Sequence, residues 1–202
     1  MSEQEHQDKM KKLQKEQREK VRSKLIDRGI LIVNTGDGKG KSTAAFGTAM
    51  RAVGHGYKVA VVQFIKGNWS TGEQKIFETF DEITHIVSGD GFTWDTQDKS
   101  QDIASAEKGW EKVLELIETA RNNPKDLHLL VLDELNIALS LGYLNTEKIV
   151  ATLKNKPEAL NIVVTGRGAP EALIEVADTV TEMKPVKHAF ESGIQAQRGI
   201  EF

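Results

Sequence analysis

The sequence predicts a single α/β domain with a mostly parallel sheet of about six strands and helices on both faces. Three observations predict it. From residue 29 onward, short apolar runs typical of buried strands alternate with helical segments. A glycine-rich loop joins the first of these runs to the first helical segment. The 202 residues, 39% of them hydrophobic and 28% charged, suffice for one domain with a sizeable core.

The apolar runs and the segments between them define the expected order of elements. Six strands are predicted, over residues 30–34, 58–64, 83–87, 128–132, 161–165 and 179–183. Five helices are predicted between them, over residues 42–52, 72–80, 100–122, 146–155 and 171–177. The clearest helix is 100–122, where apolar residues recur every three or four positions, and Asn123 and Pro124 end it.

The first 28 residues form a separate segment ahead of the domain, which we place at residues 29–202. They are rich in Glu, Lys, Gln and Arg and contain no glycine or proline, which favours a helix. Their apolar stripe is thin: Met10, Leu13, Val21, Leu25 and Ile26. Such a helix is not stable alone in water, so the residues by themselves favour a solvated extension, with docking on another surface as the alternative.

Composition excludes several classes of function. The chain has no cysteine, which excludes disulfides, thiolate metal sites, iron–sulfur clusters and a cysteine nucleophile. No apolar run approaches the ~18 residues of a membrane span, and the charged N-terminus lacks a signal peptide's apolar core. We therefore expect a cytoplasmic protein with no membrane partner. The overall net charge is −3, and the first 28 residues carry +3, so residues 29–202 carry −6. A domain this acidic argues against nucleic-acid binding.

The strongest motif is the phosphate loop in residues 34–43, Asn-Thr-Gly-Asp-Gly-Lys-Gly-Lys-Ser-Thr. It lies between a predicted strand and a predicted helix, where glycines let backbone N–H groups converge on phosphate oxygens. Lys41 supplies a cation, and the Ser42 hydroxyl is a ligand for Mg²⁺. The first glycine is displaced by one position from the usual pattern, and Lys39 adds a second cation.

Further residues complete a predicted site for Mg²⁺ and a nucleoside triphosphate. Asp133 and Glu134 directly follow a buried strand, where a carboxylate can hold Mg²⁺ itself or through water. Arg51 and Arg167 are candidate phosphate contacts, and Arg167 follows a strand end, where open sheets bind ligands. The chain has no guanine-reading N-K-x-D element, no G-x-S-x-G nucleophile motif and no histidines at metal-ligand spacing.

Several motifs together resemble one family, from about residue 29 to the C-terminus. They are TGDGKGKSTAAFG, RAVGHG at 51–56, VVQFIKG at 61–67, GFTW at 91–94, VLDEL at 131–135, VTGRG at 164–168, and KPVKHAF with the closing GIEF. The chain resembles the ATP:corrinoid adenosyltransferases of the cob(I)alamin or cob(I)yrinic acid a,c-diamide type. The charged N-terminal helix also fits this family.

The resemblance implies a fold, a reaction and partners. It implies a RecA-like phosphate-loop fold that transfers the 5′-deoxyadenosyl group of ATP to the cobalt of a reduced corrinoid and releases triphosphate. The corrinoid would be cob(I)alamin, cobinamide or cobyrinic acid diamide, within adenosylcobalamin biosynthesis and salvage. It further implies a homodimer, a reduced flavoprotein as electron donor, and an N-terminal segment that folds over the active site as a lid.

The resemblance also assigns roles to residues of this chain. Lys41 would be the main catalytic cation, and Phe92 and Trp94 the apolar wall under the corrin ring. Ser42 and Glu134 would hold Mg²⁺. The ATP-binding residues would be Gly36, Asp37, Gly38, Lys39, Gly40, Lys41, Ser42, Thr43, Arg51 and Arg167.

Two positions depart from the family pattern. Ser42 stands where the family often has Thr, and both residues offer a hydroxyl. Asp37 stands where relatives carry Asn, and a carboxylate beside polyphosphate is repelled unless it faces away, pairs with Lys39 or contacts a ribose hydroxyl.

Two other functions fit the loop and Asp133–Glu134. One is a conventional phosphate-loop kinase or ATPase, which would leave GFTW unexplained. The other is a nucleotide-gated corrinoid-binding protein without turnover.

Overall fold

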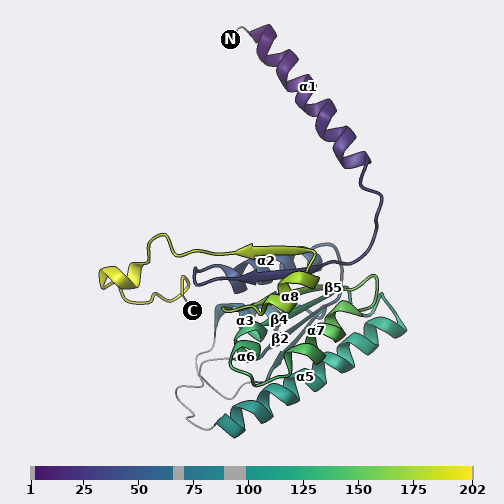
Figure 1. Ribbon diagram of the computed structural model, residues 1–202. Helices are drawn as coiled ribbons and strands as arrows, with labels where there is room; N and C mark the ends of the chain where they lie inside the picture. The colour runs from purple at the N-terminus through teal and green to yellow at the C-terminus, as the bar shows by residue number, and fades with distance from the viewer. Residues whose placement is uncertain (1–2, 66–70, 89–98, 202) are drawn as a thin grey trace.

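Six parallel strands form one sheet in the part of the chain that the computed structural model describes, residues 3–65, 71–88 and 99–201 (Figure 1). The strands are β1 (Leu31–Thr35), β2 (Val59–Gln63), β3 (Ile83–Val87), β4 (Leu129–Asp133), β5 (Asn161–Thr165) and β6 (Thr179–Glu182). Their order across the sheet is β3-β2-β4-β5-β1-β6, and every neighbouring pair is parallel. The predicted α/β class and the RecA-like, phosphate-loop type of sheet are thereby confirmed.

The described helices agree with the sequence except at two places. They are α1 (Glu3–Arg22), α2 (Lys41–Val53), α3 (Gly72–Phe77), α5 (Lys99–Asn122), α6 (Leu135–Ser140), α7 (Thr146–Lys154), α8 (Glu171–Val176) and the short 3₁₀ helix η1 (Ala189–Ser192). The sequence did not predict α6 or η1. The six residues of α6 carry no helical period of their own, and Leu135, Ala138 and Leu139 are fixed instead by burial.

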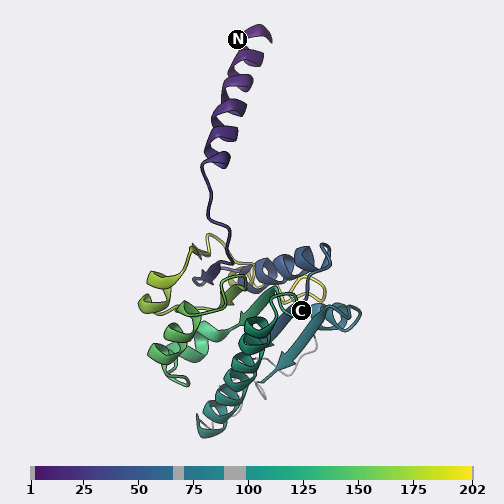
Figure 2. The ribbon, with the colours of Figure 1, turned by 90° about the vertical axis from the view of Figure 1, so that its right-hand side faces the viewer.

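Helices cover both faces of the sheet, as predicted. One face packs against α2 and α3, and the other packs against α5, α6, α7 and α8 (Figures 1 and 2). Successive residues of β2 divide between them, because Val59 and Val61 face one side and Ala60 and Val62 the other. Both faces are buried, which explains why the central strands are continuous apolar runs.

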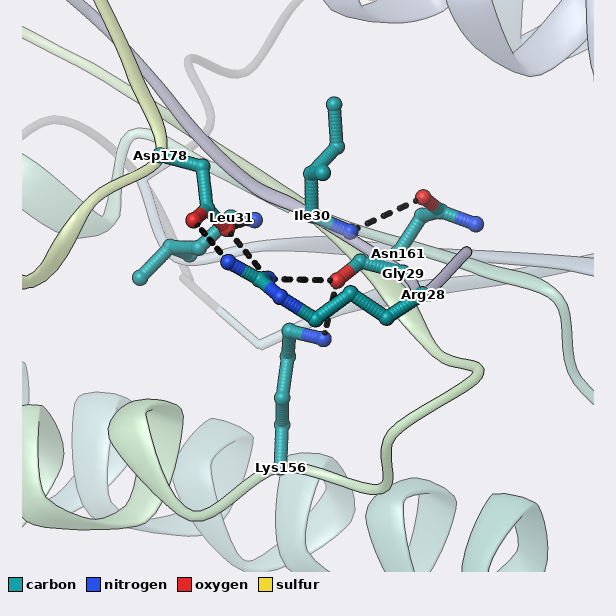
Figure 3. A network of polar contacts seen from close by, with 7 residues as sticks. All are labelled: Arg28, Gly29, Ile30, Leu31, Lys156, Asn161 and Asp178. Atoms are coloured by element: carbon teal, nitrogen blue, oxygen red, sulfur yellow. Dashed lines mark hydrogen bonds and ion pairs between the residues drawn. The ribbon is translucent and has the colours of Figure 1, made fainter. Parts of the chain in front are cut away.

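The N-terminal segment joins the domain at the amino ends of the strands, through the polar network in Figure 3. Arg28 donates from its two Nη atoms to the two carboxylate oxygens of Asp178, at 2.9 and 2.5 Å, and the Leu31 N–H donates to Asp178 at 2.8 Å. These bonds lower the pKa of Asp178 to about 2, the Arg28 hydrogen bond contributing most. Lys156 Nζ donates to the Gly29 carbonyl at 2.8 Å. The network therefore ties the start of β1 to β6 and to the segment after α7.

Helix α1 stands away from the sheet in both ribbon views (Figures 1 and 2). No residue of α1 as described, Glu3–Arg22, is buried, and Met10 and Leu13 are 48% and 41% exposed. The helix predicted for this segment is therefore present. None of the helices within the described residues combines the length and the apolar character that a membrane span needs.

Candidate functional site

Three strand ends bring the predicted site residues to one edge of the sheet. The phosphate loop, residues 36–40, follows β1, Glu134 follows β4, and Gly166 and Arg167 follow β5. Strands β4, β5 and β1 are neighbours in this order and all run in the same direction, so their carboxyl ends lie together. Ligands of open parallel sheets bind at this edge, where connections leave the strands for the covering helices.

The backbone of the phosphate loop requires glycine at its two ends. Gly36 has φ +91°, and a Cβ there would lie 2.5 Å from the Met183 carbonyl oxygen. Gly40 has φ +106° and occupies the N-cap position of α2 without any side chain to cap the helix. The Gly38 N–H donates to the carbonyl of Met183, the residue after β6, at 2.7 Å, which holds the middle of the loop against the end of that strand. The first turn of α2 is therefore left uncapped, and an uncapped helix N-terminus favours phosphate.

Lys41 is the buried cation of the loop. Its side chain is buried, and the ammonium donates to the Gly38 carbonyl at 2.7 Å. Burial lowers the pKa of Lys41, while the negative charges of Glu134 and Asp37 act in the opposite direction. Asn34 Nδ2 donates to the Lys41 carbonyl at 3.4 Å. A long flexible side chain is thus held at the loop before any phosphate arrives, which reduces the ordering cost of binding.

Glu134 presents a buried carboxylate oxygen that lacks a partner. Its Oε2 has no hydrogen-bond partner among the described residues. Burial raises the pKa of Glu134 to about 7; the charge of Asp133 adds to this, while Lys41 opposes it. Glu134 has φ +60°, the one positive value of a non-glycine residue in the described chain. Backbone strain of this kind is concentrated at functional sites.

The residues at this edge fit a divalent cation. A buried carboxylate oxygen without a donor is a hard ligand of the kind that Mg²⁺ prefers, and the half-buried Ser42 lies in the first turn of α2. No group of three His, Asp or Glu side chains suited to a metal exists within residues 3–65, 71–88 and 99–201. Mg²⁺ usually binds through one or two protein oxygens, with phosphates and water as the other ligands. Ser42 and Glu134 suit that mode.

Two ion pairs lie around the phosphate loop. Arg167 Nε lies 3.8 Å from Asp37 Oδ1, with side chains 65% and 79% exposed. Lys39 pairs with Glu201 near the C-terminus. Asp37 thus pairs with Arg167 rather than with Lys39, the partner considered from sequence. The C-terminal segment reaches the phosphate loop, which the sequence did not predict.

The other predicted site residues lie on α2 or outside the described residues. Thr43 is exposed in the first turn of α2. Arg51 is exposed in the last turn of α2, about 15 Å along the helix axis from Lys41, so the structure does not bring it to the loop. Phe92 and Trp94 lie outside the described residues.

Three polar residues at the same edge were missed by sequence reasoning. Thr165 Oγ1 donates to Asp133 Oδ1 at 2.6 Å, and Gln63 Nε2 donates to Asp133 Oδ2 at 2.9 Å. Asn136 is fully buried and donates to the Gly166 carbonyl at 3.0 Å. A polar residue at the last position of a buried strand is the signal that marks Gln63 and Thr165.

Comparison with known proteins agrees with this geometry. Residues 27–202 match the family described as ATP:corrinoid adenosyltransferase BtuR/CobO/CobP. The chain belongs to this family. A protein of Pseudomonas aeruginosa named corrinoid adenosyltransferase is 50% identical over 200 residues, 98% of this chain and 96% of that protein. One of Escherichia coli with the same name is 42% identical over 202 residues, the whole of both chains.

A third corrinoid adenosyltransferase, from a Sinorhizobium species, is 51% identical over 189 residues, 92% of this chain and 86% of its own. Membership of the adenosyltransferase family, inferred from the sequence motifs, is thereby confirmed. The phosphate loop, Glu134 and the C-terminal GIEF all lie within the matched range.

Proposed function

We propose that this protein transfers the 5′-deoxyadenosyl group of ATP to the Co(I) of a reduced corrinoid and releases triphosphate. The observation that carries the proposal is the family match over residues 27–202. Buried Lys41 at the phosphate loop, and the Glu134 Oε2 that has no hydrogen-bond partner among the described residues, would supply the nucleotide and metal site that the reaction needs. Full-length similarity to named corrinoid adenosyltransferases supports the choice of reaction.

The reaction asks for positioning and charge stabilisation from the protein. The Co(I) electron pair forms the bond to C5′, and the C5′–O bond breaks with its electrons passing to the triphosphate. The protein needs no nucleophile of its own, because the cofactor carries the difficult chemistry. Negative charge grows on the leaving triphosphate, where Lys41 and the amides of residues 36–43 would stabilise it. Gly38 and Lys39 belong to this loop and Thr43 to the first turn of α2, and Asp37 would stay on the loop's outer side with Arg167.

Ser42 and Glu134 would hold Mg²⁺ with the nucleotide. When bound, the ion supplies positive charge that neutralises phosphate oxygens. Glu134 would then be ionised, since a nearby cation favours the charged carboxylate over the protonated form that burial favours. Arg51 remains a candidate contact to the ribose or phosphates only if the nucleotide extends along α2.

The corrinoid would lie against Phe92 and Trp94. An apolar wall offers cobalt no axial ligand, which favours four-coordinate Co(II) and eases reduction to Co(I). We infer a reduced flavoprotein as electron donor and a cytoplasmic location, where ATP and a reductant are both present. Cob(I)alamin, cobinamide and cobyrinic acid diamide remain the candidate substrates.

Helix α1 would close the site as a lid, with residues 29–202 as the catalytic domain. Its 20 residues span about 30 Å, whereas β1 spans about 17 Å, so the helix is long enough to pass from the amino ends of the strands to the carboxyl edge. Its exposed Met10 and Leu13 supply the apolar contacts that docking needs. In a homodimer, the same helix could reach the partner's site.

Product analysis tests the proposal. The protein is incubated with MgATP and chemically reduced cob(I)alamin, and the nucleotide and corrinoid products are separated. We expect triphosphate and an adenosylated corrinoid in equal amounts. ADP and phosphate would instead indicate a kinase or ATPase, and no product would indicate a binding protein.

A further inference from the structure

A row of side-chain hydrogen bonds crosses the carboxyl edge of the sheet from β3 to β5. His85 Nε2 on β3 lies 2.8 Å from Gln63 Oε1 on β2. Gln63 Nε2 donates to one oxygen of Asp133 on β4 at 2.9 Å, and the Thr165 hydroxyl on β5 donates to the other at 2.6 Å. The Glu134 backbone N–H donates to Thr165 Oγ1 at 3.0 Å. The row thus ends at the residue proposed to hold the metal.

The chemistry of the groups fixes the direction of each bond in the row. Thr165 has one hydroxyl proton, which it gives to Asp133, so it meets the Glu134 N–H only as an acceptor. Gln63 gives its amide N–H to Asp133, so its carbonyl oxygen accepts from His85 Nε2–H. Both oxygens of Asp133, which is 3% exposed, are occupied by neutral donors within the sheet. Asp133 is therefore a buried support, whereas Glu134 carries the unpartnered oxygen.

The row acts on Glu134 through its backbone. A left-handed backbone is unfavourable for glutamate, and the bond from its N–H to Thr165 holds that conformation. The backbone conformation also determines the direction of the Glu134 side chain. Its Oε2 lies so near Gly166 that a Cβ on that residue would come within 2.9 Å of it. If the Glu134 backbone took another conformation, its carboxylate would no longer lie at this position to bind a cation.

We propose that Thr165, backed by Asp133 and Gln63, is a positioning residue that sets the Glu134 carboxylate for metal binding. The inference rests on the proposed function in taking Glu134 as a metal-binding residue. Thr165 itself touches neither metal nor nucleotide. Its hydroxyl couples the buried Asp133 carboxylate to the Glu134 backbone. Loss of this hydroxyl therefore weakens metal binding and leaves the affinity for metal-free ATP unchanged.

The test measures metal and nucleotide binding separately, without a corrinoid. Mn²⁺ replaces Mg²⁺, and its affinity for the protein–ATP complex is measured by electron paramagnetic resonance; ATP affinity is measured in EDTA. For Thr165→Val we expect Mn²⁺ affinity to fall by about 10-fold or more, as for other residues that orient metal ligands. ATP affinity in EDTA should stay within about twofold of the wild type, and Thr165→Ser should restore Mn²⁺ affinity, since it keeps the hydroxyl.

Two controls make the outcome specific. Thr84→Val removes a hydroxyl from an exposed position of β3 and should change neither affinity. Should Thr165→Val not fold, Gln63→Met removes one donor to Asp133 at similar volume, and we expect about a threefold or greater loss of Mn²⁺ affinity in a variant that is less stable but still melts cooperatively. Unchanged Mn²⁺ affinity in the folded variant, or an equal loss of Mn²⁺ and metal-free ATP binding, would overturn the positioning role.

Glu134→Gln separates this inference from the proposed function. If it weakens Mn²⁺ binding while Thr165→Val or Gln63→Met does not, the positioning role is wrong and the metal role of Glu134 stands. If Glu134→Gln leaves Mn²⁺ affinity unchanged, both are wrong.

Discussion

Replacing Glu134 by Gln should change how the stability of the ligand-free protein depends on pH. Burial raises the pKa of Glu134 from an ordinary 4.5 to about 7. Between these values the folded protein keeps a proton that the unfolded chain has released. The stability contributed by the protonated group is therefore fully present below about pH 4.5 and is lost as the pH rises through about 7.

The size of the effect follows from the shift. One pKa unit corresponds to ~1.4 kcal/mol, so the shift at Glu134 amounts to about 3 kcal/mol when the carboxyl is ionised in place. Relaxation of the buried group reduces this value, and we expect about 2 kcal/mol. Glutamine has nearly the same shape and does not titrate. Any constant cost of its amide cancels when the two proteins are compared across pH.

The assay is urea unfolding of the wild type and Glu134→Gln in EDTA, followed by circular dichroism from about pH 4.5 to about pH 8. The wild type should lose about 2 kcal/mol of unfolding free energy relative to the variant over this range. Adding Mg²⁺ and ATP at the higher pH should stabilise the wild type more than the variant, since the ion favours the ionised carboxylate. Parallel pH curves for the two proteins would refute the argument that Glu134 is a buried carboxyl held ready for a cation.

Three further predictions concern other charged residues. Lys41→Ala should lower the rate of adenosyl transfer to cob(I)alamin by about 10²–10³, because it removes the cation facing the leaving triphosphate, and a near-normal kcat would contradict this role. Glu201→Gln frees Lys39 from its ion pair and should lower the KM for ATP by about two- to fivefold, an effect weakened by salt; a raised KM would show that Glu201 assists binding. Asp178→Asn should lower the melting temperature by about 2–4 °C at neutral pH, because it removes the charge that pairs with Arg28. Because the pKa of Asp178 is lowered to about 2, that difference should shrink as the pH falls below about 4, and a constant difference would exclude the ion pair as its cause.

The sequence predicted those parts of the molecule whose signals are local. Buried parallel strands are continuous apolar runs. The phosphate loop is marked by glycines such as Gly36 and Gly40, whose positive φ values its conformation needs. Glu134 could be predicted because it directly follows a buried strand. Helix α6 could not, since only Glu134 separates its six residues from that strand and they owe their helical form to packing against the sheet.

The contacts that the sequence could not predict join residues far apart in the chain. Thr165 lies 32 positions from Asp133, and Gln63 lies 70 positions from it, so their bonds depend on which strands become neighbours. Strand order is a property of the whole fold rather than of any motif. The pairing of Glu201 with Lys39, 162 positions away, likewise depends on the course of the C-terminal segment. For Asp37, the repulsion expected beside polyphosphate indicated that the carboxylate needs a partner, but only the structure identifies that partner as Arg167.

The position of bond cleavage tests the central claim most directly. ATP carrying a heavy oxygen isotope at the atom that bridges C5′ and the α-phosphorus is incubated with the protein, Mg²⁺ and cob(I)alamin, and the products are analysed by mass spectrometry. Attack of Co(I) on C5′ breaks the bond between carbon and this oxygen, so the account predicts that all of the label leaves with triphosphate. Label retained in ADP or AMP would place the cleavage at phosphorus and contradict the account.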